Sequence, residues 1–111
     1  MNTAVMNETL SILLVDLKAK LIELYGDRLF SLILFGSQAR GEATSDSDID
    51  VMVILNGSVD IAKEIYRMSA IRSYFLMHYD ELVSILPVSK EEYLSRASSF
   101  IRVVGREGIV L

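Results

Sequence analysis

The stretch that decides the fold reads GSQARGEATSDSDID and occupies residues 36–50. The segment before it, LFSLILF at 29–35, is almost wholly apolar, and the segment VMVIL at 51–55 follows it. Short apolar runs of this kind, bounded by turn residues, are typical of strands that are buried on both faces. The sequence therefore predicts strands at 29–35 and 48–55, joined by a Gly-Ser turn and a polar loop.

Apolar periodicity predicts a helix on either side of this pair of strands. Leucines at helical spacing predict a first helix at 7–25. A second helix is expected at 60–78, after the turn dipeptide Asn56-Gly57 ends the second strand. Its predicted buried stripe is Ile61, Ile65, Met68, Ile71 and Phe75.

The rest of the chain predicts a third strand at 82–88 and a further helix. The segment 89–92, Ser-Lys-Glu-Glu, has the form of a capping box, so this helix begins there and is expected to end near Gly105. The apolar residues 109–111 add a short final strand. The order α-β-β-α-β-α predicts an α+β fold, in which a small mixed sheet of three or four strands is flanked by helices.

The composition limits the class of protein. The 111 residues are 51% hydrophobic, which suits one folded domain, expected to span 1–111, and excludes a disordered chain. No apolar run reaches the roughly 18 residues of a membrane span, and the lack of cysteine excludes disulfides and thiolate metal sites. A cytoplasmic setting fits these features. The formal net charge of −4 disfavours duplex nucleic acid as a partner, because binding to its phosphates needs a basic face.

Gly36 and Ser37 have the features of a phosphate-binding turn. Gly36 has no Cβ, so the backbone can turn sharply and a phosphate can come close. Ser37 falls where a short helix would begin, so its hydroxyl and the adjacent N–H groups can bind phosphate oxygens. This helix is expected to include Arg40 and to end at Gly41. A Gly-Ser pair after a strand is also common in plain turns, so the pair alone predicts little.

Asp48 and Asp50 are the second chemical feature. They are two residues apart on a strand, so both side chains point to one face, with Cα atoms about 6.6 Å apart. Such carboxylates can converge on two divalent cations, and oxygen ligands beside phosphates favour Mg²⁺, with Mn²⁺ as a substitute. An Asp-x-Asp at the start of a strand is often only solvated. It is the combination with the Gly-Ser turn that indicates a nucleotide site.

The pattern Gly36-Ser37-x10-Asp48-x-Asp50 resembles the signature of the DNA polymerase β-like nucleotidyltransferases. It is most similar to their smallest members, the minimal nucleotidyltransferase (MNT) domains. The likeness extends to the GSxARG form of the turn, the SDIDV strand and the closing segment REGIVL at 106–111. The resemblance implies a nucleotidyltransferase fold that binds the phosphates of ATP at Gly36 and Ser37. It also implies two Mg²⁺ ions held by Asp48 and Asp50.

Two further site assignments are open. The resemblance implies a third carboxylate on a neighbouring strand, as a metal ligand that also positions the attacking hydroxyl. Asp80 and Glu81 point to opposite faces, so only one can serve; Asp80 is preferred, because Tyr-Asp before an apolar strand looks closer to the family, but Glu81 is also possible. If neither lies near Asp48, the domain binds nucleotide without transferring it.

Arg40 either contacts the triphosphate or is a structural partner of a nearby acidic residue, Glu42 or Asp46.

The resemblance also implies a function. Many MNT domains are antitoxins encoded beside a HEPN-domain RNase toxin, and some silence it by adding AMP to a toxin tyrosine (AMPylation). We therefore expect transfer of a nucleoside monophosphate, with AMP from ATP preferred, to a hydroxyl of such a partner. The short chain leaves little surface for recognising an acceptor alone, and its acidic character suits a basic toxin. The alternatives are a non-catalytic antitoxin that acts by contact and a transferase that modifies a small hydroxyl compound.

Overall fold

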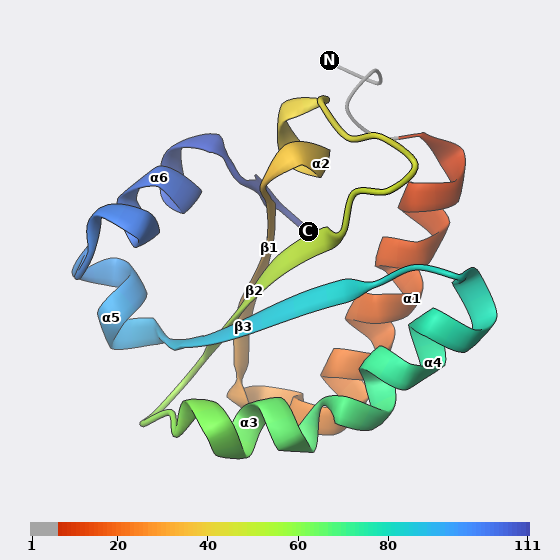
Figure 1. Cartoon of the computed structure of the whole chain (residues 1–111). Helices are drawn as coiled ribbons and strands as arrows, with labels where there is room; N and C mark the ends of the chain where they lie inside the picture. Colours follow the sequence, from red (N-terminus) through yellow and green to blue (C-terminus); the bar gives the residue numbers. More distant parts are fainter. Residues whose placement is uncertain (1–6) are drawn as a thin grey trace.

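The computed structural model describes residues 7–111, which form a four-stranded mixed sheet with helices on both faces (Figure 1). The strands lie in the order β3-β2-β1-β4. They are β1 (Leu29–Phe35), β2 (Ile49–Leu55), β3 (Val83–Ser89) and β4 (Ile109–Val110). Strand β1 is antiparallel to both β2 and β4, whereas β2 and β3 are parallel. The predicted α+β fold with a small mixed sheet is confirmed.

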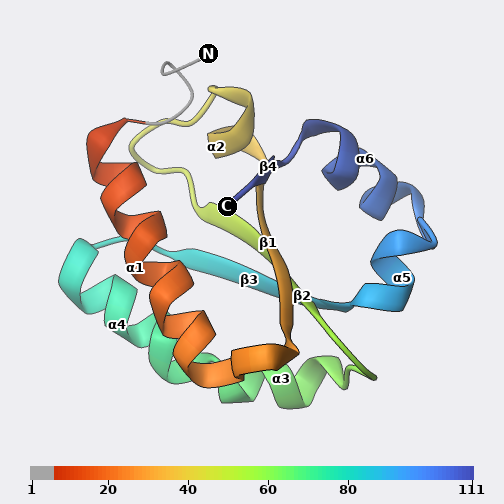
Figure 2. The ribbon, with the colours of Figure 1, turned by 180° about the vertical axis from the view of Figure 1, so that it is seen from behind.

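The helices divide between the two faces of the sheet. One face carries α1 (Glu8–Tyr25), α3 (Ile61–Arg67) and α4 (Ser69–Tyr79), and the other carries α5 (Lys90–Leu94) and α6 (Ser99–Glu107) (Figures 1 and 2). A short helix α2 (Ser37–Arg40) follows β1, and a 3₁₀ turn η1 (Gly26–Arg28) precedes it. None of the helices formed by residues 7–111 is long and apolar enough to cross a membrane.

Alternation along the strands produces two cores. The larger core lies under α1 and α4 and contains Leu13, Leu17, Leu21, Leu34, Val51, Val53, Phe75 and Ile85, among others. The smaller core lies under α6 and contains Ile33, Met52, Ile54, Val88, Ile101 and Val104. Since neighbouring strand residues point to opposite faces, the residues of β2 between those of the larger core face α5 and α6.

The predicted helix at 60–78 is wrong in one respect, because it is two helices. The chain leaves helical geometry at Met68, where φ is −90° and ψ is 2°. The predicted buried stripe still crosses this break, since Ile65 and Ile71 are partly buried, but it fails at its first residue. Ile61 is 53% exposed, while Glu64, one turn later, is only 2% exposed. Met68 and Phe75 are buried as expected.

The helix predicted from residue 89 to about Gly105 is also two helices. Ser89 caps the helix as predicted, because its hydroxyl oxygen accepts from the Glu92 N–H at 3.1 Å, but the Glu92 carboxylate accepts from the Ser89 hydroxyl at 3.3 Å and not from the Ser89 N–H of a full capping box. Helix α5 is nevertheless only one turn long, since Arg96 adopts a left-handed conformation with φ of +54°. Ser98 then caps a new helix by accepting from the Ile101 N–H at 3.1 Å. Ser98, a residue type that favours N-cap positions, lies inside the predicted helix and was the sequence signal for this break.

Candidate functional site

The site is built around the contact between Gly36 and Asp50. Strands β1 and β2 are antiparallel with Phe35 opposite Asp50, so the end of β1 lies beside the start of β2. Gly36 has φ of +74°, and a Cβ added there would lie 2.5 Å from Asp50 Oδ2. Only glycine fits such a position without strain or a clash. The glycine predicted to admit a phosphate therefore also packs its backbone against a carboxylate of the same site.

The short helix after Gly36 is present as the sequence predicts. It spans Ser37 to Arg40, and Gly41 closes it in the left-handed conformation with φ of 72° and ψ of 23°. The N–H groups of Ala39 and Arg40 both donate to the Gly36 carbonyl, at 3.1 and 3.2 Å. The amides of Ser37 and Gln38 are the first two of the helix, so no carbonyl of α2 itself can accept from them. These two amides and the Ser37 hydroxyl suit an anionic ligand.

Asp48 and Asp50 create a local concentration of negative charge. Asp50 is partly buried, and burial raises the pKa of its carboxyl above the usual value. The negative charge of Asp48 raises this pKa further, while Arg40 acts in the opposite sense. Ile49, between the two acids, belongs to the core on the opposite face. This arrangement agrees with the prediction that both carboxylates face the same side of the sheet, and their donor chemistry suits a hard divalent cation.

Arg40 has both a structural partner and a place at the site. Its Nε donates to Glu42 Oε1 at 2.8 Å, and its Nη1 lies 3.8 Å from Glu107 Oε1 on α6. The hydrogen bond with Glu42 raises the pKa of Arg40, and the carboxylates of Glu107 and Asp50 act in the same direction. Both interpretations of Arg40 are therefore compatible with its position. Its contact with triphosphate stays a prediction.

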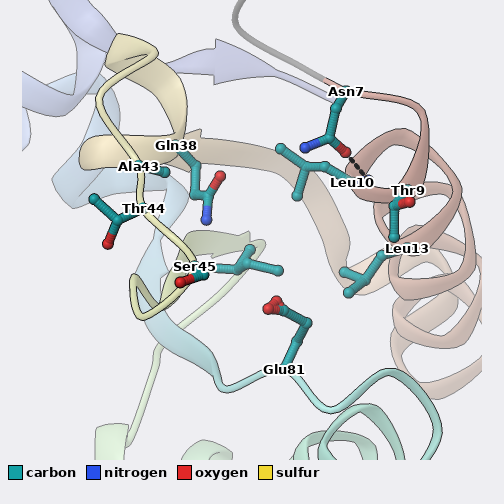
Figure 3. Close-up of a pocket in the computed structure, with 10 residues that line it drawn as sticks. Asn7, Thr9, Leu10, Leu13, Gln38, Ala43, Thr44, Ser45 and Glu81 are labelled. Carbon is teal, nitrogen blue, oxygen red and sulfur yellow. Dashed lines mark hydrogen bonds between the residues drawn. The ribbon is translucent and has the colours of Figure 1, made fainter.

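The two candidates for the third carboxylate lie elsewhere. Asp80 is exposed at the left-handed C-cap of α4, with φ of 54°. Glu81 lines a cavity of about 290 Å³ together with Gln38 and Ile49, on the α1 side of the sheet (Figure 3). Among residues 7–111, no three acidic, histidine or cysteine side chains lie close enough together to hold a metal ion. The structure thus does not bring Asp80 or Glu81 together with Asp48 and Asp50, and the assignment of Asp80 stays a prediction without geometric support.

The residue that the strands do place beside Asp50 is Ser84. Strands β2 and β3 pair in parallel with Asp50 opposite Ser84, and Ser84 is exposed. Ser84 is not among the residues predicted for the site, because an acid before the third strand was expected there. The sequence signal was the alternation along the third strand. Ser84 lies between the buried Val83 and Ile85, so its side chain faces the opposite side of the sheet from theirs.

The sequence matches the nucleotidyltransferase domain family over residues 14–105. It is 31% identical over 94 residues to a protein of Methanocaldococcus jannaschii named "Putative protein adenylyltransferase MJ0141", covering 85% of this chain and 90% of that protein. It is 35% identical over 88 residues to a second protein of that organism, "Putative protein adenylyltransferase MJ0604", covering 78% and 82%.

Solved structures show the same fold. A "putative nucleotidyltransferase" from Sulfolobus solfataricus aligns with 96% of this chain and 85% of its own, with a TM-score of 0.66 and 17% identity. A chain from a toxin–antitoxin complex with AMP-PNP aligns with 86% of this chain and 69% of its own, with a TM-score of 0.57 and 21% identity. A chain from the MntA–HpeT toxin–antitoxin pair gives the same TM-score at 18% identity. With the family match over most of its length, this chain belongs to the nucleotidyltransferase domain family, as the resemblance of its Gly-Ser and Asp-x-Asp motifs predicted.

Proposed function

We propose that this nucleotidyltransferase moves AMP from ATP to a hydroxyl of a partner protein, a tyrosine of a HEPN-type RNase toxin, and so acts as its antitoxin. The two relatives named as protein adenylyltransferases support a protein acceptor and an adenylyl group. The structural neighbours from toxin–antitoxin complexes, one of them with AMP-PNP, support the partner class and the nucleotide.

The observation that carries the proposal is the packing of Gly36 against Asp50 beside the start of α2. A nucleotide whose phosphates lie on the Gly36-Ser37 turn lies next to the Asp48 and Asp50 carboxylates. The Ser37 and Gln38 amides donate hydrogen bonds to phosphate oxygens, and Arg40 adds a positive charge at the rim. The turn therefore binds phosphate, and the two acids bind the cations that accompany it.

The acids Asp48 and Asp50 fit Mg²⁺ or Mn²⁺, since two carboxylates on one face otherwise repel each other. When bound, such cations neutralise phosphate charge and activate the attacking and leaving oxygens. In the transfer, the acceptor hydroxyl oxygen forms a bond to the α-phosphorus, the α–β phosphoanhydride bond breaks, and pyrophosphate leaves. The hydroxyl proton is lost to the carboxylates or to water. The chain's own residues contribute by positioning the phosphates and orienting the α-phosphorus.

The test is intact-mass spectrometry of the partner protein after incubation with this protein, ATP and Mg²⁺. The expected result is a gain of one or more AMP units on the partner, mapped by peptide sequencing to tyrosine. Asp48→Asn should reduce the gain at least a hundredfold, whereas the matched control Asp46→Asn should leave it unchanged. Asp46 lies in the same loop, is exposed, and is an aspartate of the same charge. Parallel incubations with GTP, CTP and UTP test the choice of nucleotide.

One observation favours a second candidate, an antitoxin that neutralises its partner by contact alone. No third acid lies with Asp48 and Asp50 among residues 7–111. A stable complex that inhibits the toxin equally with and without ATP, and no mass gain with any nucleotide, would support this candidate and reject the transferase.

A further inference from the structure

The sheet places three side chains in one row at the level of Asp50. Phe35 of β1 lies opposite Asp50 on one side, and Ser84 of β3 lies opposite it on the other. Neighbouring strands are about 4.8 Å apart, so paired side chains on one face are within reach of a shared ligand. Phe35 offers no ligand atom, whereas the Ser84 hydroxyl offers a neutral oxygen. A cation bound by Asp50 therefore has the Ser84 oxygen as its neighbour on β3.

The residue that pairs with Asp48 on the segment before β3 offers no alternative cation ligand. The Ile49 N–H donates to the Leu82 carbonyl at 2.9 Å, which continues the β2–β3 register to the residues before β3. The side chain that this register sets beside Asp48 is Leu82, which is 59% exposed and cannot bind a cation. Glu81 points into the cavity on the other side of the sheet (Figure 3). Asp80 caps α4, with its N–H bonded to the Leu76 carbonyl at 3.1 Å.

We propose that Ser84 occupies the third ligand position of this site, so that Asp48, Asp50 and the Ser84 hydroxyl bind a divalent cation with two protein charges. The proposal rests on the proposed function, since it concerns the same site. It replaces Asp80 as the third residue. A hydroxyl contributes an oxygen but no charge, so the site binds a free cation weakly. The phosphates of the nucleotide then supply the remaining anionic ligands.

The proposal is tested with Mn²⁺ alone, measured by the electron paramagnetic resonance of the free ion at equilibrium with the whole protein. Ser84→Asp adds the missing charge and should tighten Mn²⁺ binding at least tenfold. Ser84→Asn introduces a side chain of the same size as aspartate but without charge, so its Mn²⁺ affinity should stay within threefold of the wild type. Asp48→Asn should weaken binding at least tenfold, and Asp80→Asn should change it by less than twofold.

Two further measurements separate ligation from folding. A third acid beside Asp50 repels it, so Ser84→Asp should melt at a lower temperature than the wild type in EDTA and regain that loss in Mn²⁺. Ser84→Ala removes the hydroxyl without adding charge and should weaken Mn²⁺ binding about two- to fivefold. An unchanged affinity in Ser84→Ala, or no gain in Ser84→Asp, overturns the proposal. So does a loss in Asp80→Asn as large as that in Asp48→Asn.

These outcomes are independent of the transfer reaction. If Mn²⁺ binding follows Ser84 as described but the partner gains no AMP, the proposed function fails and the ligand assignment holds. If AMP transfer occurs and both transfer and Mn²⁺ binding depend on Asp80, the proposed function holds and this ligand assignment fails.

Discussion

At the scale of single residues, Gly36 joins backbone conformation to the chemistry of the site. Its positive φ would be unfavourable for any residue with a side chain, and the space that a Cβ needs is already taken by the Asp50 carboxylate. Gly57 has a similar φ of +83° but nothing within 4 Å of the Cβ position. The two glycines therefore share a positive φ, but only Gly36 has a carboxylate against its Cβ position.

Replacement of each glycine by alanine separates the two effects. Gly57→Ala should lower the free energy of unfolding by about 1–2 kcal/mol, the usual cost of a left-handed conformation. Gly36→Ala should cost more, because its ψ of −157° lies in a region that essentially only glycine occupies and because Asp50 must also move. It should weaken Mn²⁺ binding at least tenfold, while Gly57→Ala leaves this binding unchanged. Urea unfolding gives the first quantity and Mn²⁺ titration the second. Equal effects of the two substitutions on both would show that the Asp50 contact is unimportant.

At the scale of elements, Glu64 of α3 connects its own helix to the junction of α1 and η1, which is distant in sequence. Its carboxylate accepts from Tyr25 Oη at 2.8 Å, Arg28 Nη1 at 2.8 Å and Arg67 Nε at 3.1 Å. These partners belong to α1, η1 and α3. Burial alone would raise the pKa of Glu64, but the hydrogen bonds from Arg28 and Tyr25 outweigh it and hold the pKa below its usual range. The buried acid is thus stabilised in its charged form and fixes the end of α1 against α3.

The stability contributed by Glu64 should depend on pH. Because its folded-state pKa is lowered, this contribution is complete above the ordinary value of 4.5 and is lost as the pH falls through the folded-state pKa. Glu64→Gln should therefore lower the free energy of unfolding at pH 7 by about 1–3 kcal/mol. The difference from the wild type should shrink as the pH falls well below 4.5. Urea unfolding across pH measures it, with the exposed Glu23→Gln as a control expected to change little; a difference independent of pH would contradict the argument.

At the scale of the whole molecule, the order of the elements could be predicted from sequence because apolar periodicity and turn residues are local signals. The strands at 29–35, 48–55 and 82–88 all appear within one residue of their predicted bounds. The break at Met68 was missed because the apolar periodicity continues through it, and the break at Arg96 was missed although Ser98, a residue type that favours N-cap positions, follows it. The position of Ser84 beside Asp50 was missed for a different reason. It depends on the pairing of β2 with β3, and register between strands is not a local property of either.

The two cores differ in size, and the candidate site lies on the face with the smaller one. Among the described residues, seventeen buried side chains form the core under α1 and α4, and six form the core under α6. The smaller core reaches the site through Phe35. The Phe35 ring packs edge-to-face on the Phe100 ring of α6, with 5.5 Å between the ring centroids. Since local stability follows the number of buried apolar contacts, α5 and α6 should open more readily than α1 and β2.

Native-state hydrogen exchange with mass spectrometry tests this difference in stability. In the wild type, amides of α6 should exchange at lower denaturant than those of α1 and β2. Leu17→Ala, in the larger core and fully buried, should lower global stability by about 2–5 kcal/mol and speed exchange throughout. Ile101→Ala, in the smaller core, should speed exchange mainly in α5 and α6. If Ile101→Ala speeds exchange in α1 and β2 equally, the two faces unfold as one unit. If the effect is local, Ile101→Ala should weaken nucleotide binding while β2 stays folded, because α6 supports the Asp50 side of the sheet through Phe100 and Phe35.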